Sequence, residues 1–430
     1  MLYDRWRQTA QERARALALR DLASGRQWNF AALARRVEAM PRGDARVVYP
    51  QGHAAEFIFA VLQGWRSGAV VCPLEPGQAP PQVRPPPRLC CHLKITSATT
   101  GAPRTIAFTA EQLAADADDI VGTMGLRPDW PNLGVISMAH SYGFSNLVLP
   151  LLLHGIPLIL PPSPLPEAVR RAAAGARALT VAGVPALWSA WHEAGAVPAH
   201  VRLAISAGAP LADTLERAVF KASGLKIHNF YGSSECGGIA YDAGSELRPE
   251  GDCAGAPMRN VKIALNVEGC IRVTSRAVGE TYWPDADDTL RAGRFQTSDL
   301  GELKGGLVFL RGRLSDQINV AGRKVSPATI EGALREHEAV RNCVVFSVPS
   351  LDADRTDLIV ACVEGAAPVA AEALKQSLLN KLPAWQVPRE WWFVESLGTT
   401  PRGKVSRAQW RKRYLERRNT GGTAAQVQDS

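Results

Sequence analysis

The feature that most constrains the fold is an alternation of short apolar runs with helix-like stretches over the first half of the chain. Between residues 47 and 73, an apolar run, a helical pattern at 54–65 and a second apolar run at 68–73 indicate strand, helix and strand. Further strand candidates lie at 133–138, 157–160, 179–182, 202–206 and 226–230. Alternating strands and helices form mostly parallel sheets covered by helices. The sequence therefore predicts an α/β fold.

The pattern changes after Asp252, where short strand candidates separated by turn residues predict a small β-rich subdomain. From residue 316 to about residue 415, helix and strand patterns indicate a separate α+β unit. We therefore expect a large N-terminal domain of helix-covered, mostly parallel sheets over 1–314, a small mobile α+β domain over 315–416 and a disordered tail over 417–430.

Composition excludes several classes of protein. Of 430 residues, 46% are hydrophobic and 21% charged, values far from those of disordered or fibrous chains. The longest apolar stretch, 147–160, is interrupted by prolines and is shorter than the ~20 residues of a membrane-spanning helix. The first residues lack the apolar core of a secretory signal, so we expect a cytoplasmic location. The eight cysteines show no zinc-site spacing and are expected to be reduced and buried.

The net charge of +8 favours acidic partners, which include nucleic acid, nucleotide phosphates and an acidic carrier protein. Much of the excess lies between Arg402 and Arg418, where a solvated helix face is the ordinary alternative. No aromatic residues are interleaved as a stacking platform, so we do not expect nucleic-acid binding.

The segment from Lys94 to Arg104 is the most informative local motif. It reads KITSATTGAPR, with four hydroxyl side chains and a glycine between an apolar run and a basic residue. Hydroxyls and backbone N–H groups can surround phosphate oxygens, while Arg104 supplies positive charge. The pattern is not a Walker loop, because GxxxxGK[ST] is absent. Taken alone, the segment is compatible with a phosphate-binding loop or an ordinary turn.

Four further motifs follow in order along the chain. They read NFYGSSE at 229–235, FQTSDLG at 295–301, GRLSDQINVAG at 312–322 and PRGKVSR at 401–407. Together with the Ser/Thr-rich loop, they resemble the adenylate-forming (ANL) superfamily of acyl- and aryl-CoA synthetases, peptide-synthetase adenylation domains and firefly luciferase. The likeness spans nearly the whole chain.

Two departures from the family pattern bear on function. The strand–helix unit usual after Pro73 is missing, and only the proline-rich segment 75–88 fills its place, which implies a shortened N-terminal subdomain. Ala98 and Arg104 stand where the family usually has glycine and lysine, which implies a phosphate loop with less freedom to move.

The resemblance implies an ATP site built from the Ser/Thr-rich loop and several later segments. Its residues are Thr96, Ser97, Thr99, Thr100, Gly101, Arg104, Gly208, Ala209, Pro210, Asn229, Tyr231, Gly232, Ser234, Asp299 and Arg313. The loop would hold the β- and γ-phosphates, and 206–210 with Tyr231 would enclose the adenine. Ser234 would contact the α-phosphate, whereas Asp299 and Arg313 would bind the ribose. Taken singly, a helix-capping Asp299 and a surface salt bridge of Arg313 are the ordinary alternatives.

The resemblance also implies a catalytic apparatus. When a carboxylate attacks the α-phosphate of ATP, two anions meet and negative charge spreads over the phosphoryl oxygens. Glu235 would bind Mg²⁺, and Lys404 would bridge the carboxylate and the α-phosphate. Lys404 lies about 90 residues beyond the hinge at Ser315, so domain closure would be part of catalysis. Gly322 would leave room for a pantetheine arm.

The segment HSYGFSN at 140–146 resembles the family's segment beside the acyl pocket. His140 would lie at the carboxylate end of that pocket, with a purely structural histidine as the alternative. The remaining pocket residues would be Tyr142, Gly143, Asn146, Val184 and Ala207. A likeness to benzoate-CoA ligases favours a compact aromatic acid, although an apolar pocket suits a medium-chain fatty acid equally.

The resemblance thus implies an ATP-dependent acid–thiol ligase that adenylates a small apolar carboxylic acid. The acceptor would be the phosphopantetheine thiol of CoA or of an acidic acyl-carrier protein. The alternative is a catalytically weak or inactive nucleotide- or acyl-binding protein of the same fold, which Ala98, Arg104 and the shortened N-terminal region would permit.

Overall fold

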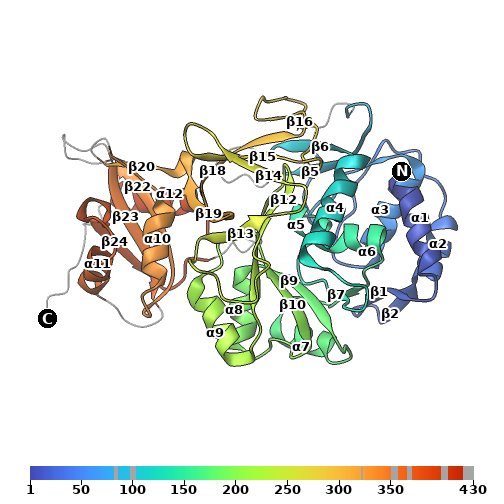
Figure 1. Ribbon diagram of the computed structural model, residues 1–430, viewed down its shortest axis with the longest axis horizontal. Helices are drawn as coiled ribbons and strands as arrows, with labels where there is room; N and C mark the ends of the chain where they lie inside the picture. Colours follow the sequence, from blue (N-terminus) through green and yellow to red (C-terminus); the bar gives the residue numbers. More distant parts are fainter. Residues whose placement is uncertain are drawn as a thin grey trace.

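The computed structural model describes residues 1–81, 86–96, 103–320, 323–349, 357–365, 370–398 and 405–419. A large N-terminal part carries most of these residues, and a smaller C-terminal part begins near residue 314. The two parts lie side by side along the long axis of the molecule, with the C-terminal part at the left in Figure 1.

The largest sheet is parallel in one half and antiparallel in the other. Its parallel half has the strand order β11–β10–β9–β7–β8–β1, and β2 pairs antiparallel with β1 at the edge. The strands are β1 (Leu17–Asp21), β2 (Arg26–Asn29), β7 (Asn132–Leu133), β8 (Leu158–Leu160), β9 (Leu179–Gly183), β10 (Val201–Ser206) and β11 (Ile227–Ser233). Strand β9 is buried at every position, as expected where helices cover both faces of a parallel sheet. The α/β prediction is confirmed.

The antiparallel half of this sheet begins at β12, directly after β11. Its strands are β12 (Gly237–Tyr241), β13 (Cys253–Pro257), β14 (Lys262–Leu265), β15 (Cys270–Thr274), β17 (Leu290–Arg291), β18 (Arg294–Lys304) and β19 (Leu307–Arg313). The predicted β-rich segment is therefore present, and β12 and β13 join it by hydrogen bonds to the parallel half.

A second sheet has the order β16–β6–β5–β4–β3. Its strands are β3 (Val47–Val48), β4 (Val70–Val71), β5 (Cys90–Ile95), β6 (Thr105–Thr109) and β16 (Thr281–Trp283). The described residues between β4 and β5 contain no helix or strand, as the prolines at 75–88 predict. The predicted shortening of this region stays a prediction.

Helices cover both sheets of the N-terminal part. They are α1 (Leu2–Glu12), α2 (Phe30–Glu38), α3 (Ala55–Ser67), α4 (Ala110–Met124), α5 (Ser141–Gly143), α6 (Leu149–His154), α7 (Pro166–Ala173), α8 (Pro185–Glu193) and α9 (Asp213–Ser223), with a π-helical turn η1 (Phe144–Val148). Helix α4 illustrates how local sequence sets the helix ends. Thr109 and Gln112 form a capping box at its start, and Gly125 ends the helix with φ +68°. Its buried face includes Leu113, Ala117 and Ile120, which follow helical spacing.

The C-terminal part is an α+β unit built on the three-stranded sheet β22–β23–β24. Its elements are η2 (Leu314–Asp316), β20 (Ile318–Val320), β21 (Arg323–Val325), α10 (Pro327–Arg335), β22 (Val340–Pro349), β23 (Asp357–Gly365), α11 (Ala371–Leu379), η3 (Ala384–Gln386), β24 (Glu390–Val394) and α12 (Arg407–Asn419). Helices α10 and α11 pack on one core, and α12 packs on a second through Trp410. Helix α12 continues to Asn419, three residues into the segment predicted as a tail. The predicted domain boundaries otherwise stay predictions.

All eight cysteines are free, six of them buried and two half-buried. Among the described residues, no helix has the length and apolarity needed to cross a bilayer.

Candidate functional site

Several predicted site residues meet where three neighbouring parallel strands end. Gly183 of β9 pairs with Ser206 of β10, which in turn pairs with Asn229 of β11. The residues that follow these ends are Val184, Ala207, Gly208, Ala209, Pro210, Tyr231 and Gly232. Ligands of open α/β sheets bind at the carboxyl ends of the strands, so this edge is the candidate site. The side-chain amide of Asn229 itself donates to the Cys253 carbonyl of β13, at 2.9 Å.

The predicted acyl-pocket segment reaches the same edge. Tyr142 donates a hydrogen bond from its hydroxyl to the Gly183 carbonyl at 3.3 Å, and its ring lies 5.8 Å from that of Phe230. A Cβ at Gly143 would lie 1.9 Å from the Ser137 carbonyl oxygen, so only glycine fits there. Asn146 donates to the Tyr142 carbonyl at 3.2 Å, while its own buried Oδ1 has no partner among the described residues. An unpaired buried acceptor is costly, and it marks a place for a polar ligand atom or a water.

His140 faces a carboxylate that the sequence analysis did not single out. Its Nε2 lies 3.0 Å from Glu75 Oε1, and Ser137 donates from its hydroxyl to the same oxygen. Glu75 belongs to the proline-rich segment that was predicted only as an irregular connection. No sequence signal joins residues 75 and 140, because their contact depends on the packing of two loops.

Asp299 and Arg313 are opposite each other on β18 and β19, the antiparallel strands that extend the sheet beside the site. Arg313 Nε donates to Asp299 Oδ1 at 2.9 Å, and the Tyr231 hydroxyl donates to Asp299 Oδ2 at 2.6 Å. Burial, followed by the Asp299 carboxylate, raises the pKa of Tyr231 well above its ordinary value, which keeps the phenol protonated. Asp299 lies within a strand and caps no helix, so that ordinary alternative is wrong.

Ser234 and Glu235 lie in the tight turn between β11 and β12, where the large sheet changes from parallel to antiparallel. The backbone of Gly237 has φ +68°, and a Cβ there would lie 2.0 Å from Asp116 Oδ1. Asp116 also accepts from Gly238 N at 3.3 Å, so its carboxylate holds the turn.

Asp116 ties this turn to two further segments of the site. It lies 3.6 Å from Lys94 Nζ and accepts from the Ser145 hydroxyl at 2.5 Å. Both members of the ion pair are almost completely buried. A sequence signal for this pair existed, since Lys94 interrupts an apolar strand and Asp116 interrupts the apolar face of α4.

Thr96 and Arg104 close the base of the Ser/Thr-rich loop. Thr96 N donates to the Arg104 carbonyl at 2.8 Å, and Arg104 N donates to Thr96 Oγ1 at 2.9 Å. The Arg104 side chain pairs with Asp287 at 3.1 Å and stacks on the Tyr282 ring, 3.3 Å from its centroid. The loop residues between them that were predicted to bind phosphate lie outside the described residues; they are Ser97, Thr99, Thr100 and Gly101, with Ala98 among them.

Two of the predicted C-terminal residues, Lys404 and Gly322, also lie outside the described residues. Ser315 lies in η2, and its hydroxyl donates to Asp316 Oδ1 at 3.3 Å. Arg407 was grouped with a solvated basic face, but it bonds to Asp316, to Glu331 at 2.8 Å and to a β22 carbonyl. At Arg407 that expectation is wrong, because three groups of the C-terminal part enclose the guanidinium.

Among the described residues, no cluster of three or more His, Cys, Asp and Glu side chains could hold a metal ion. This composition still fits Mg²⁺, which binds through one or two carboxylates together with substrate phosphates. Glu235 is half-buried and belongs to no ion pair among the described residues, so its charge is available for such a cation.

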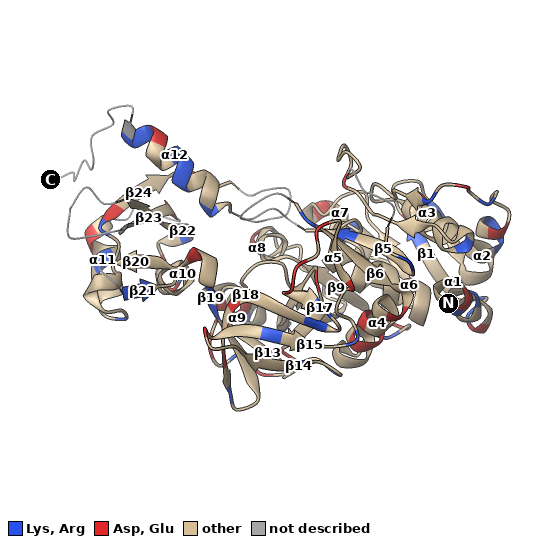
Figure 2. Cartoon of the chain, turned by 90° about the horizontal axis from the view of Figure 1, so that it is seen from above, with Lys and Arg blue, Asp and Glu red and all other residues tan. Residues whose placement is uncertain are grey.

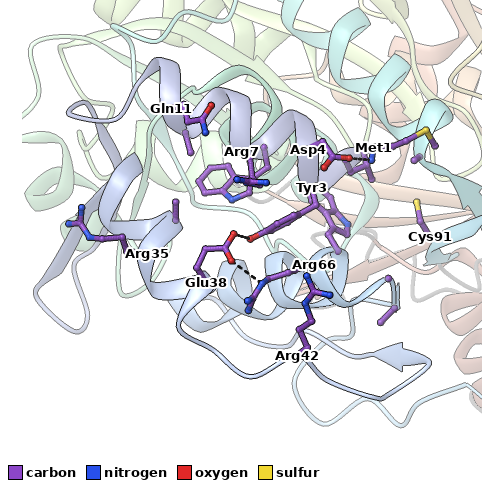
Figure 3. Close-up of a pocket in the computed structure, with 18 of the residues that line it drawn as sticks. Met1, Tyr3, Asp4, Arg7, Gln11, Arg35, Glu38, Arg42, Arg66 and Cys91 are labelled. Carbon is purple, nitrogen blue, oxygen red and sulfur yellow. Dashed lines mark hydrogen bonds and ion pairs between the residues drawn. The ribbon is translucent and has the colours of Figure 1, made fainter.

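A cavity of about 1130 Å³ lies elsewhere, between α1, α2 and the end of α3 (Figure 3). Arginines from all three segments line it, and Glu38 in its wall accepts from Tyr3 and pairs with Arg66. None of the predicted site residues lines this cavity, so it is separate from the candidate site.

Comparisons with known proteins agree with the motif order. The family model "AMP-binding enzyme" matches residues 75–283, and the model "AMP-binding enzyme C-terminal domain" matches residues 329–404. Together the two matches span more than half of the chain.

Among curated proteins, the chain is 29% identical over 343 residues to a probable 2-succinylbenzoate–CoA ligase of Mycobacterium tuberculosis, covering 74% of this chain and 83% of that protein. It is 27% identical over 347 residues to a feruloyl-CoA synthase of an Amycolatopsis species, covering 75% of this chain and 70% of that protein.

Among solved structures, ATP-bound MatB from Rhodopseudomonas palustris superposes with a TM-score of 0.84 at 20% identity, covering 96% of this chain and 98% of that one. The o-succinylbenzoate CoA synthetase of Bacillus subtilis in complex with its acyl-adenylate gives 0.78 at 19% identity, covering 95% and 97%. At these identities the likeness concerns the fold.

Proposed function

Because the chain belongs to the family of AMP-binding enzymes, as an AMP-forming synthetase of the acyl- and aryl-CoA type, we propose that it adenylates a small apolar carboxylic acid and passes the acyl group to a phosphopantetheine thiol. The observation that carries this proposal lies at one edge of the sheet, where Asp299 bonds to Tyr231 of β11 and Tyr142 bonds to Gly183 of β9. The turn that carries Glu235 directly follows β11.

The nucleotide would lie along this edge. The Asp299 carboxylate can accept from both vicinal hydroxyls of a ribose, and Arg313 and Tyr231 hold it in place. Glu235 would hold Mg²⁺, which supplies positive charge to the phosphate oxygens. Ser234 and the loop from Thr96 to Arg104 would contact the phosphates.

The acid would lie between β9 and η1. Tyr142, Gly143, Val184 and Ala207 are uncharged, which favours an apolar body, and Asn146 Oδ1 offers one polar contact. Several relatives are named for aryl acids, namely 2-succinylbenzoate, ferulate and anthranilate. We therefore propose an aromatic acid as substrate, with His140 and its partner Glu75 at the carboxylate end.

The proposed reaction has two steps, adenylation of the acid and transfer of the acyl group to the thiol. A carboxylate oxygen of the acid would bond to the α-phosphorus while the bond to pyrophosphate breaks, and the Lys404 ammonium would offset the developing negative charge. The thiolate of the acceptor would then bond to the acyl carbon, and AMP would leave with the former carboxylate oxygen. Gly322 would leave space for the pantetheine arm, and Ser315 would be the hinge of the domain movement between the steps.

The acceptor is proposed to be CoA, and a specific feature supports an acidic carrier protein as a second candidate. Helix α12 carries exposed Arg411, Lys412 and Arg413, and Figure 2 shows basic residues along this helix. Such a surface complements acidic partners.

Incubating a radiolabelled acyl-adenylate with CoA or with a phosphopantetheinylated carrier protein identifies the acceptor, and inertness toward both would exclude thioester formation.

Exchange of labelled pyrophosphate into ATP, measured across aryl and alkyl acids, tests the adenylation step. We expect exchange that depends on the acid and is fastest with an aryl acid. Nucleotide binding without exchange for any acid would instead support an inactive binding protein.

Lys404→Ala provides the sharpest variant in the same assay. We expect loss of exchange by ~100-fold or more, because the transition state would lose its neutralising cation. Lys412→Ala is the matched control, since this lysine is exposed on α12 and pairs with Glu416 of the same helix at 3.8 Å. Full-speed exchange by Lys404→Ala would contradict the proposal.

A further inference from the structure

Tyr282 lies between two site residues that come from separate motifs. Its hydroxyl donates to Glu235 Oε1 at 3.1 Å, and its ring carries the Arg104 guanidinium at 3.3 Å from the centroid. The tyrosine itself is 5% exposed, whereas the Arg104 side chain is 41% exposed and Glu235 is half-buried. One side chain thus joins the turn after β11 to the end of the Ser/Thr-rich loop.

The backbone explains how a residue so far along the chain reaches this place. Strand β16 pairs antiparallel with β6, with Tyr282 opposite Ile106 and Trp283 opposite Thr105. Just before β16, Gly279 N donates to the Glu235 carbonyl at 2.8 Å. Residues 279–283 are therefore bonded both to the turn that carries Glu235 and to the strand that follows Arg104.

The charges around Tyr282 are arranged asymmetrically. Arg104 pairs with Asp287 at 3.1 Å, and Asp287 also accepts from Thr289. Glu235 receives the Tyr282 hydroxyl on Oε1 only, and no described group bonds to Oε2. A carboxylate held in this way has one oxygen committed to a neutral donor and one oxygen available for a cation.

We propose that Tyr282 is a positioning residue for the phosphate end of the nucleotide: it orients the Glu235 carboxylate for a divalent cation and couples it to Arg104. The inference rests on the proposed function and deepens it, since it assigns a role to a residue outside the five motifs. Neutral hydrogen bonding leaves the Glu235 charge intact, whereas a lysine or arginine at the same place would compete with the cation.

Tyr282→Phe in the full chain tests this role, because phenylalanine keeps the ring under Arg104 and removes only the hydroxyl. By calorimetry we expect roughly tenfold weaker binding of ATP with Mg²⁺, the loss of one hydrogen bond to a charged group. Binding of ATP in the presence of EDTA should be unchanged, because Glu235 acts through the cation.

Tyr3→Phe is the matched control. It also removes a tyrosine hydroxyl that donates to a glutamate, Glu38 at 2.7 Å, but does so at the separate cavity in Figure 3. We expect its affinity for ATP to equal that of the wild type with and without Mg²⁺. Thermal midpoints of both variants report any general loss of stability.

A double-mutant cycle separates positioning from plain packing. If Tyr282 acts through Glu235, adding Tyr282→Phe to Glu235→Gln should cause no further loss of affinity. Additive losses, an equal loss without Mg²⁺, or unchanged binding by Tyr282→Phe would each overturn the inference.

The same samples distinguish this inference from the proposed function. If the wild type binds ATP with Mg²⁺ but exchanges no pyrophosphate with any acid, the ligase proposal fails while the Tyr282 cycle can still succeed. A wild-type chain that does not bind ATP with Mg²⁺ contradicts both.

Discussion

The candidate site contains two clusters of the same three residue types, a tyrosine, a carboxylate and an arginine, in different arrangements. In the first, Asp299 receives both the Tyr231 hydroxyl and the Arg313 guanidinium. In the second, the Glu235 carboxylate receives one hydrogen bond from the described residues, that of the Tyr282 hydroxyl. Arg104 covers the Tyr282 ring, and the Arg104 guanidinium pairs with Asp287.

The two clusters differ in which carboxylate the arginine pairs with: Arg313 pairs with Asp299 of its own cluster, whereas Arg104 pairs with Asp287 and not with Glu235. Arg313 compensates the Asp299 carboxylate directly, which suits hydrogen bonding to a neutral ligand such as a pair of hydroxyls. The Glu235 carboxylate has no cation in contact among the described residues, which suits binding of an added cation. Two clusters of like composition can therefore serve a sugar and a metal ion.

Within these two clusters, the largest effect is expected from Glu235→Gln, which removes the uncompensated charge. We expect acid-dependent pyrophosphate exchange to fall by ~100-fold, because the phosphoryl charge would lose its neutralisation. Exchange assayed across a range of Mg²⁺ concentrations measures the effect. The exposed Glu268→Gln serves as control, and a variant of Glu235 with normal Mg²⁺ dependence would remove the distinction between the clusters.

A smaller loss is expected from Asp299→Ala, which removes the carboxylate to which Arg313 Nε and the Tyr231 hydroxyl donate. We expect ATP to bind ~30-fold more weakly, the cost of lost hydrogen bonds to a charged acceptor. Wild-type protein should prefer ATP over 2′,3′-dideoxy-ATP, and the variant should bind both equally. Retained discrimination between these nucleotides would place the ribose elsewhere.

Tyr231→Phe tests the same cluster with a milder change, because it removes only the hydroxyl that donates to Asp299. We expect about fivefold weaker ATP binding, since Arg313 continues to hold the carboxylate. Calorimetry with and without Mg²⁺ should give the same ratio, in contrast to Tyr282→Phe. A Mg²⁺-dependent ratio for Tyr231→Phe would mean that the two clusters are not independent.

The smallest effect at neutral pH concerns Tyr231 and Tyr142, whose pKa values burial raises well above the ordinary value. A raised pKa in the folded state contributes stability that is complete below the unfolded-state value of about 10 and is lost as pH rises beyond it. We therefore expect the contribution of these two tyrosines to the free energy of unfolding to be constant up to about pH 9 and to fall above about pH 10. Phenolate absorbance should show these tyrosines ionising only with unfolding, and reversible ionisation near pH 10 in the folded protein would contradict the raised pKa values.

Local pattern accounts for much of the fold. The alternation of apolar runs and helical stretches predicted the parallel half of the large sheet, and the capping residues of α4 stand where its helix begins and ends. The strand predicted at 133–138 was only partly right: β7 ends at Leu133, and the chain then leaves the sheet toward Ser137 and His140, where it contributes to the site.

Motif order accounts for part of the site in the same way. Asp299 and Arg313 were expected together and lie in contact, because both motifs are carried by adjacent strands of one hairpin. Glu75, Asp116 and Tyr282 were not predicted in the site. Each reaches it through a contact between segments far apart in the chain, and no spacing rule relates such segments.

The amino-acid sequence alone was sufficient for the fold class and the family, because periodicity and motif order are properties of neighbouring residues. The distribution of charge within the site depended on the folded chain. Whether an arginine neutralises a carboxylate or merely covers the tyrosine beside it is set by strand pairing across more than 170 residues, as between β6 and β16, and Coulomb energies follow distances in space.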